Sequence, residues 1–414
     1  MIVTSENTLP INSGALSHIR VLDLSRILAG PWCTQNLADL GAEVIKVERP
    51  GHGDDTRAWG PPWINMEEKI SSYFAAANRG KKSLTLNLST PQGKRIIEEL
   101  VKISDVVIEN YKIGDLKRYG LDYESLQKIN PRLVYCSITG YGQDGPNAQK
   151  PGYDFVFQAI GGLMSITGEA DSEPGGGPQK VGIAIADVIT GMYSTIAILA
   201  ALNSREQTGF GQYIDMALLD SIIALGGNQI TGYFANGKVP FRYGNAHASL
   251  VPYQVFAVKD GEIVIAVGND TQWQRYCEAI VRPDLAQDPK WEKVTGRITG
   301  RSELIPHLAK TMLEKNRDEW ISILESYDVP CGPINNYQQV FEDPHVIHRE
   351  IKVDTRYKDG STISTIASPL RLKSTPPEYK RPPPKLGDSN FEILHQLLGY
   401  SAESIEQFKK EKIT

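Results

Sequence analysis

Apolar and polar positions alternate in short blocks through the first 140 residues. Apolar or alternating runs that predict strands occupy residues 19–24, 42–48, 83–88, 105–110 and 132–138. Between them, residues 31–41 predict a helix with proline in its first turn and glycine at its end, and a second helix follows Thr90-Pro91. This rhythm predicts a Rossmann-like α/β fold, in which helices cover both faces of a mostly parallel sheet.

The rest of the chain changes character. Residues 188–205 and 215–237 predict helices, and two alternating runs around Lys259-Asp260-Gly261 predict a hairpin. We therefore expect a large Rossmann-like domain over 1–225 that is completed by 335–414, and a smaller α+β domain over 250–330. Residues 226–249 would form a linker and active-site loop. Residues 331–414 would return the chain to the large domain and end in a helix.

Composition narrows the class of protein. A chain of 414 residues exceeds the usual size of one hydrophobic core, and its net charge of −5 argues against nucleic acid or an anionic membrane as a partner. The four cysteines lie far apart, which suits free thiols in a reducing compartment. The first residues lack the pattern of a targeting peptide. Residues 181–203 are apolar but contain Asp187, threonines and serines, so we expect a buried helix of a cytoplasmic protein rather than a bilayer span.

Asp187 is the residue that most needs an explanation. It interrupts an almost uncharged run over residues 177–199. A buried carboxylate costs several kcal/mol unless partners stabilise it. One interpretation is an N-cap for the helix that follows, because aspartate accepts the free backbone N–H groups there. The other is a sheltered carboxylate nucleophile. The two roles are compatible.

Three further patterns allow more than one interpretation. Residues 140–145 satisfy G-x-G-x-x-G after a strand, but prolines follow, which favours a glycine-rich loop over a dinucleotide site. Arg49 follows a strand, where open parallel sheets bind ligands, although a solvated arginine fits equally. His345 and His348 could share a helix face, but no third ligand accompanies them. We therefore expect no metal site.

Several motifs, in order along almost the whole chain, carry a family resemblance. They include RILAGPWCTQNLADLGAEVIKVERPGHGDDTRAWGPP, NRGKKSLTLNL, SDVVIENYKIGDLKRYGL, NPRLVYCSITGYGQDGP, GYDFVFQAIGGLMSITG and GIAIADVITGMY. The chain thereby resembles the class III CoA-transferases, the group of formyl-CoA transferase and carnitine CoA-transferase. The resemblance implies an interlocked homodimer with a Rossmann-like large domain and a small domain. It also implies exchange of CoA between an acyl-CoA and a free carboxylic acid, without a tightly bound cofactor.

The resemblance also implies site residues. The catalytic aspartate of the family falls on Asp187, which would be acylated during turnover. The positions implied for coenzyme A are Leu28, Ala29, Arg49, Leu86, Asn87, Leu88, Ser89, Asn110, Tyr111, Lys112 and Arg118. The positions implied near the acyl and carboxylate substrates are Trp59, Tyr153, Asp154 and the loop 242–249, which contains Gly244 as its only glycine; Arg26 and His247 are further candidates for substrate contact because of their charge.

Within the family, the similarity is greatest to the succinyl-CoA–glutarate CoA-transferases, in RYGNAHASLVPYQ, VPCGPINN and RPPPKLG. This implies a dicarboxylate acceptor, whose distal carboxylate could meet Arg26, Arg242 or His247. Leu28 replaces the glutamine of formyl-CoA transferase, which argues against oxalate. The related α-methylacyl-CoA racemases are the alternative, but Tyr153 replaces their histidine. Because a tyrosine with a pKa near 10 is a poor general base at neutral pH, transfer is favoured over racemisation.

Overall fold

The protein is described here from a computed structural model, which covers residues 14–65 and 70–414. Its internal contacts group the chain into two compact units. The first contains the chain up to Leu163, Val181–Ile230 and Ile347–Thr414, and the second contains Met164–Lys180 and Thr231–Val346. The domain boundaries expected above stay a prediction, because grouping by contacts does not establish which parts fold independently.

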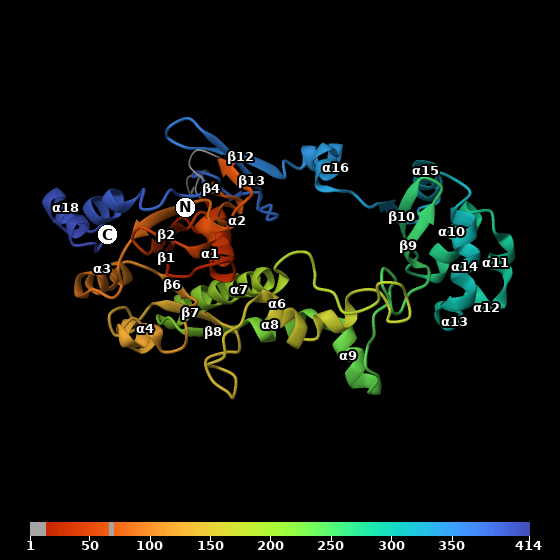
Figure 1. The fold of residues 1–414 in the computed structure, drawn as a ribbon, viewed down its shortest axis with the longest axis horizontal. Helices are drawn as coiled ribbons and strands as arrows, with labels where there is room; N and C mark the ends of the chain where they lie inside the picture. Colours follow the sequence, from red (N-terminus) through yellow and green to blue (C-terminus); the bar gives the residue numbers. More distant parts are fainter. Residues whose placement is uncertain (1–13, 66–69) are drawn as a thin grey trace, which may run out of the picture. The chain divides into compact units, whose positions relative to one another are not determined.

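The first unit is built on a six-stranded parallel sheet (Figure 1). Its strands are β1 (Arg20–Asp23), β2 (Glu43–Glu48), β5 (Lys81–Thr85), β6 (Val106–Glu109), β7 (Val134–Thr139) and β8 (Tyr213–Ala217). They lie in the order β5-β2-β1-β6-β7-β8, and every neighbouring pair is parallel. Counted along the chain this is the order 3-2-1-4-5-6 of doubly wound dinucleotide-binding sheets. The order reverses between β1 and β6, where such folds bind ligands beyond the carboxyl ends of the strands.

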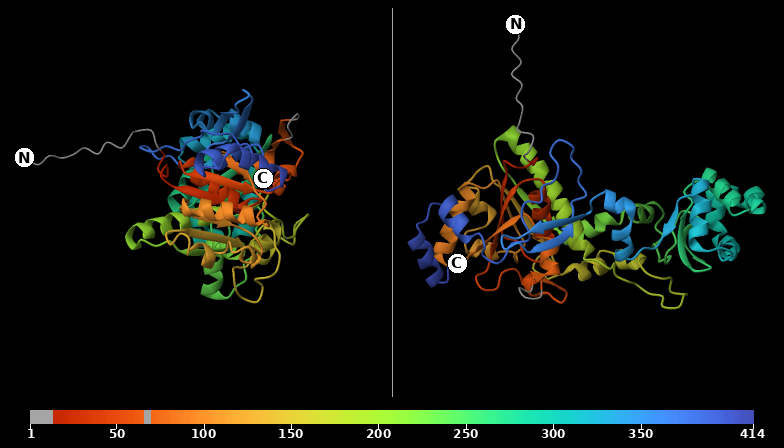
Figure 2. Two further views of the ribbon diagram at one scale, coloured as in Figure 1. Left: turned by 90° about the vertical axis from the view of Figure 1, so that its left-hand side faces the viewer. Right: turned by 90° about the horizontal axis from the view of Figure 1, so that it is seen from above.

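Helices cover both faces of this sheet, as Figure 2 shows for α3 and α18 on one side and α7 on the other. The helices of the unit are α1 (Ala29–Asp39), η1 (Asp55–Ala58), α2 (Ser72–Ala76), α3 (Pro91–Lys102), α4 (Asp115–Arg118), α5 (Tyr123–Leu126), α6 (Asp154–Ile160), α7 (Ile185–Thr208), α8 (Leu218–Leu225), η3 (Glu392–Leu397) and α18 (Ala402–Lys410). One core packs α1, α6, α7 and α8 against the sheet, and the other packs α3, η3 and α18 against its opposite face. The expected α/β architecture with a large parallel sheet is confirmed.

Some expected elements differ in the structure. The strand expected over 83–88 is β5 (Lys81–Thr85), and β8 lies partly inside the helix expected over 215–237. Because β8 lies at the edge of the sheet, most of it is exposed or half-buried, and its sequence lacks the continuous apolar run of an inner strand. Two small hairpins were not expected at all. They pair β3 (Trp63–Asn65) with β4 (Ile70–Ser71), and β12 (Lys352–Arg356) with β13 (Thr362–Ile366).

Helix α7 passes close beneath α1. A methyl group on Gly191 would lie 2.6 Å from the carbonyl oxygen of Ala29, so the glycine permits this approach. Among the described residues, α7 alone is long and apolar enough to cross a bilayer, with a window of mean hydropathy 1.8 that is 44% buried. The expectation that this segment is too polar was therefore wrong. Since the core helix of a folded domain passes the same test, the finding is weak evidence for a membrane span.

The second unit has a small antiparallel sheet in the order β11-β10-β9. Strands β9 (Tyr253–Val258) and β10 (Gly261–Ala266) pair through Val258 and Gly261, which confirms the predicted hairpin. The remaining elements are β11 (Cys331–Pro333), α10 (Asp270–Ala279), α11 (Pro283–Gln287), α12 (Pro289–Glu292), α13 (Val294–Thr299), α14 (Arg301–Met312), α15 (Arg317–Ser326) and α16 (Tyr337–Glu342). Three helical segments cross the boundary between the units: η2 (Leu163–Ile166), α9 (Gly227–Asn236) and α17 (Pro344–His348).

The four cysteines form no disulfide in the described residues, and the reducing compartment expected for them stays a prediction. Cys33, Cys136, Cys277 and Cys331 are all free thiols. Within residues 14–65 and 70–414, no group of three or more histidine, cysteine or acidic side chains is arranged to hold a metal ion.

Candidate active site

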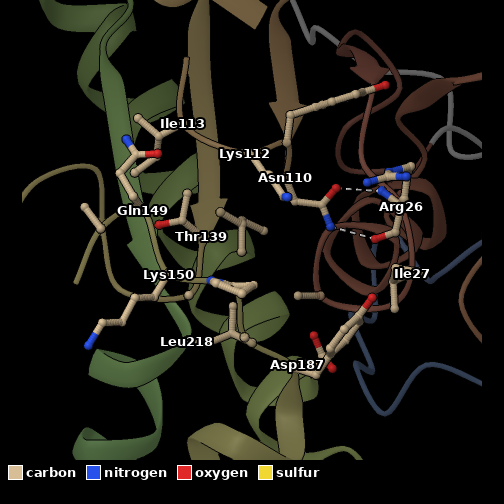
Figure 3. A pocket seen from close by; sticks show the side chains of 18 residues that line it. Arg26, Ile27, Asn110, Lys112, Ile113, Thr139, Gln149, Lys150, Asp187 and Leu218 are labelled. Carbon is tan, nitrogen blue, oxygen red and sulfur yellow. Dashed lines mark hydrogen bonds between the residues drawn. The ribbon is translucent and has the colours of Figure 1, made fainter. Parts of the chain in front are cut away.

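Two loops meet where the strand order of the large sheet reverses. One follows β1 and contains Arg26 and Ile27, and the other follows β6 and begins at Asn110. The Asn110 side chain accepts a hydrogen bond from the Arg26 backbone N–H at 2.8 Å and donates one to the Arg26 carbonyl oxygen at 2.7 Å. Figure 3 shows these two bonds, with Ile27 and Asp187 below them. One amide side chain thus joins the two loops at the point where this fold places ligands.

A cavity of about 210 Å³ opens beside these loops. Among the residues predicted from the sequence, Arg26, Ala29, Asn110, Tyr111, Lys112, Tyr153 and Asp187 line it. Their side chains come from the loops after β1 and β6, from the segment before α6 and from α7. The structure therefore brings the predicted nucleophile and six other predicted residues to one cavity.

Asp187 lies in the first turn of α7, but it is not the N-cap. The helix begins at Ile185 with Ala184 in the capping position, so the N-cap interpretation was wrong by three residues. The Asp187 carboxylate instead faces the same cavity as Ala29, the first residue of α1, and interaction with the Ala29 backbone N–H lowers the pKa of the carboxylate. Two helix N-termini therefore converge on this carboxylate, and each favours negative charge.

A second carboxylate stands beside the first. The Asp154 Oδ1 atom accepts the backbone N–H of Ala186 at 2.6 Å, and its Oδ2 atom accepts the Gln158 side chain at 2.6 Å. Burial and the negative charge of Asp154 together raise the pKa of Asp187 to about 7, against the lowering effect of the Ala29 N–H. Burial, Asp187 and Asp154 raise the pKa of the neighbouring Tyr73 to about 12. Near neutral pH, Asp187 can therefore act as a poorly hydrated carboxylate nucleophile.

A second, larger cavity of about 580 Å³ lies on the same unit. Arg49 and the four predicted residues Leu86, Asn87, Leu88 and Ser89 line it. Tyr111 lines both cavities, so the two are neighbours. The Arg49 guanidinium forms an ion pair with Asp55 at 2.6 Å and is about half exposed. A half-exposed cation in the lining of this cavity suits a phosphorylated ligand.

Other predicted residues lie outside the linings of these two cavities. Leu28 is buried as the residue before α1, and Trp59 packs edge-on against Tyr73 with ring centroids 5.0 Å apart. Asp154 is outside both linings and accepts the backbone N–H of Ala186, the residue that precedes Asp187. Arg118 is exposed and paired with Asp115. Its predicted contact with coenzyme A stays a prediction.

Two predicted residues belong to the second unit. Gly244 has a positive φ of 60° and donates its N–H to the carbonyl oxygen of Gly168 at 3.1 Å. The backbone N–H of His247 donates to the carbonyl oxygen of Tyr253 at 2.9 Å, and the Nδ1 atom of His247 accepts the backbone N–H of Ser249. Arg242, the other candidate for the distal carboxylate, is paired with Asp171 in the same unit. Their roles toward substrate stay predictions.

Several lining residues were not predicted. In the smaller cavity these include Ile27, Thr139, Gln149 and Lys150, and in the larger one His52, Tyr119 and Lys412. The lysine at 150 follows the glycine-rich loop after β7, so its position at the carboxyl edge of the sheet was an available signal. Lys412 had none, because it reaches the groove only through the packing of the C-terminal segment. There the backbone N–H of Asn87 donates to the carbonyl of Ile413 at 2.7 Å.

The fold and the site define an α/β enzyme with a ligand crevice at the switch point of a doubly wound sheet. The description "CoA-transferase family III" matches residues 16–390, and the chain belongs to this family. It is a CoA-transferase, and acyl-CoA thioesters are its substrates.

Known relatives extend the similarity over nearly the full length. A succinate–glutarate CoA-transferase from Agrobacterium fabrum is 45% identical over 94% of this chain and 97% of its own. The human succinyl-CoA:glutarate CoA-transferase is 42% identical, over 95% and 88%. A crystal structure of a CAIB/BAIF family protein from Brucella suis matches with a TM-score of 0.83 and 44% identity, covering 93% of this chain and 100% of that one.

Proposed function

We propose that this enzyme transfers CoA from succinyl-CoA to glutarate or a closely related dicarboxylate. The observation that carries this proposal is the 45% identity, over 94% of the chain, to a relative named as a succinate–glutarate CoA-transferase. Arg26 lines the smaller cavity, its Nη1 atom pairs with Asp55 at 3.1 Å, and its buried Nε atom has no partner among the described residues; we assign this guanidinium to the distal carboxylate.

The proposed mechanism uses Asp187 as the nucleophile. Its carboxylate oxygen attacks the thioester carbonyl carbon, and the C–S bond breaks. CoA departs as a thiolate, and an aspartyl–succinyl anhydride is formed. The thiolate then attacks the aspartyl carbonyl carbon, which releases succinate and forms an aspartyl-CoA thioester. Glutarate attacks this thioester, CoA thiolate leaves again, and its attack on the glutaryl carbonyl carbon yields glutaryl-CoA and free Asp187. One acyl bond replaces another in each step.

The N–H of Ala29 has a specific part in this sequence. When thiolate attacks the aspartyl carbonyl, negative charge develops on the carboxyl oxygen that Asp187 retains. The Ala29 N–H interacts favourably with the Asp187 carboxylate in the wall of the same cavity, so we assign it the stabilisation of that oxyanion. A donor of this kind contributes about 3–4 kcal/mol to transition-state stabilisation.

Coenzyme A would extend from Asp187 along both cavities. The pantetheine arm would pass Tyr111, and the phosphates would reach Arg49 and Lys412 in the larger cavity. Arg49 offers two parallel donors to phosphate oxygens, and Lys412 offers a point charge. No metal is assigned a part in any of these steps.

We further propose a homodimer as the working state. Apolar side chains on α6, α7 and α8 of the first unit are exposed, among them Phe155, Ile160, Met192, Ile196 and Ile223. Exposed apolar area of this kind is typical of a surface that a partner covers. The resemblance favours a second copy of the chain, and light scattering of the purified enzyme tests this. A monomer at micromolar concentration would contradict it.

The covalent step is tested by trapping. Enzyme mixed with succinyl-CoA, treated with hydroxylamine and digested should carry a hydroxamate on the peptide that contains Asp187. The Asp187→Ala variant should fold, bind CoA and transfer nothing. Trapping that fails in the wild-type enzyme, or transfer that persists in Asp187→Ala, would contradict the mechanism.

The acceptor is tested separately by comparing kcat/KM for glutarate, succinate, a short monocarboxylate and carnitine. A preference for the monocarboxylate or carnitine would contradict the dicarboxylate assignment. The racemase alternative predicts exchange of the substrate α-proton with solvent deuterium, whereas transfer requires none.

A further inference from the structure

The loop that carries Ala29 holds a backbone conformation that its sequence disfavours. Ile27, two residues before Ala29, has a φ of +69°. A β-branched side chain clashes with its own backbone in this region, so such residues occur there only when the surroundings enforce the conformation. Strained residues of this kind cluster at functional sites. The question is what enforces the strain in this loop.

Buried charges bond the loop from one side. The Asp54 carboxylate accepts the backbone N–H of Ile27 through both oxygens at 3.3 Å, and it pairs with Lys46 at 2.9 Å. The Lys46 ammonium also donates to the carbonyl oxygen of Ser25 at 3.0 Å. Both charged side chains are fully buried. Burial opposes ionisation of both groups, but each holds the other charged: the pKa of Asp54 falls to about 2 and the pKa of Lys46 rises.

A second buried pair bonds the same loop further along. The Asp23 carboxylate accepts the backbone N–H of Ser25 at 2.9 Å and pairs with Lys81 at 3.1 Å. The Lys81 ammonium donates to the carbonyl oxygen of Pro31 at 3.0 Å, and Thr34 donates to Asp23 at 2.6 Å. These contacts join β1 to the first turn of α1. Buried ion pairs therefore bond the loop between β1 and α1 from both sides.

These four residues, Asp23, Lys46, Asp54 and Lys81, form what we call the loop clamp. A buried ion pair contributes little net stability, because desolvation offsets much of the attraction. Four buried charges under a single loop therefore suggest a purpose other than stability. We propose that the loop clamp positions the N–H of Ala29 on the Asp187 carboxylate by holding the strained loop between β1 and α1.

The four members are positioning residues, since none of them lines the smaller cavity. This proposal rests on the nucleophile assigned to Asp187 above, and it adds a part of the molecule that touches no substrate. If the N–H of Ala29 moves away, the Asp187 carboxylate loses a donor and becomes harder to ionise. Misplacement by about 1 Å can slow a reaction about 10²-fold.

Two variants test the clamp by different routes. Asp54→Asn removes an acceptor of the Ile27 N–H and one buried charge. Gly30→Ala changes no charge, but its methyl group would lie 2.2 Å from the Ser25 Oγ atom, so the loop must shift. The matched control is Asp39→Asn, which breaks an equally buried ion pair with Arg79 at the far end of α1. If Asp54→Asn fails to fold, Gly30→Ala decides the question alone.

The measurement is the single-turnover rate of Asp187 acylation by succinyl-CoA, followed across pH by the mass of the digested peptide. Asp154 and Tyr73 interact with Asp187, and Arg26, Lys112, Lys150 and Tyr153 line the same cavity; all of these ionisable groups are unchanged in every variant. We expect both loop variants to acylate about 10²-fold more slowly, with the acidic limb of the profile about one pH unit higher. Asp39→Asn should lower the melting temperature without moving that limb.

The direction of the shift separates position from charge. Removing the negative charge of Asp54 would by itself lower the pKa of Asp187, whereas losing the Ala29 N–H raises it. Wild-type rate and profile in folded Gly30→Ala, or an equal shift in Asp39→Asn, would overturn the proposal. Failure of the wild-type enzyme to acylate Asp187 would instead refute the proposed function.

Discussion

Asp154 and Asp187 form a carboxylate pair at the first turn of α7. Asp154 bonds the backbone of Ala186, the residue that precedes Asp187. Asp154 accepts the Ala186 N–H at 2.6 Å, and with burial its charge raises the pKa of Asp187 to about 7. Burial and the charge of Asp154 thus oppose ionisation of the proposed nucleophile, and the N–H of Ala29 favours it. Four predictions follow from this arrangement and from the groove beside it.

The first prediction concerns the pH dependence of acylation. Only the ionised form of Asp187 attacks, so the rate of acylation should rise through about pH 7 and level off above it. In Asp154→Asn the neighbouring charge is gone, while the amide oxygen can still accept the Ala186 N–H. The acidic limb should therefore move to lower pH by about one unit. Rapid-quench measurements from pH 5 to 9 test this. An acidic limb at the same pH in wild type and Asp154→Asn would contradict the pairing.

The second prediction concerns stability. Because the pKa of Asp187 is about 7 when folded and about 3.9 when unfolded, the folded state binds more protons between these values. Stability therefore falls as pH rises from about 4 to 7. Asp187→Asn removes this penalty and should raise the free energy of unfolding by about 1–3 kcal/mol at pH 8, discounted for partial exposure. The gain should shrink toward pH 4 in urea unfolding, and a gain that is equal at both pH values would exclude a charge effect.

The third prediction concerns coenzyme A. Arg49 and Lys412 line the larger cavity, and either change to alanine removes a cation from the proposed phosphate site. We expect KM for succinyl-CoA to rise about 10-fold, with little change in kcat, because a charge-assisted bond contributes about 1.5–3 kcal/mol. The control is Arg95→Ala on α3, an exposed arginine paired with Glu99. Equal KM values in all three variants would place the phosphates elsewhere.

The fourth prediction concerns the contact of α1 with α7. In Gly191→Ala the new methyl group would meet the Ala29 carbonyl oxygen at 2.6 Å and the side chain of Trp32 at 3.1 Å. The helices must separate, which should lower the free energy of unfolding by about 1–3 kcal/mol and slow transfer. Gly232→Ala on α9 meets nothing within 4 Å and should be neutral or slightly stabilising. Thermal melts and steady-state rates measure both.

Local patterns determined much of the architecture. Apolar runs predicted the four inner strands β2, β1, β6 and β7, because inner strands of a parallel sheet are buried on both faces, and an alternating run predicted the edge strand β5. The edge strand β8 escaped prediction because only one of its five residues, Ala217, is buried. Asp187 could also be singled out from the sequence, because it is one charged residue in an apolar run. The partner of Asp187 was misjudged. An N-cap side chain accepts N–H groups of its own helix, whereas the Asp187 carboxylate interacts with the backbone N–H of Ala29 on α1.

What only the tertiary structure decided is which distant residues meet. Lys412 reaches the groove through the packing of the C-terminal segment on Asn87, and Asn110 reaches Arg26 because β1 and β6 are neighbours in the sheet. The buried charges under Ile27 belong to the same class, for Asp23, Lys46, Asp54 and Lys81 look like ordinary surface residues along the chain. Periodicity reports which face of an element is buried, but it holds no information on which elements lie side by side. That depends on the closing of long loops, whose free energy is distributed over the whole fold.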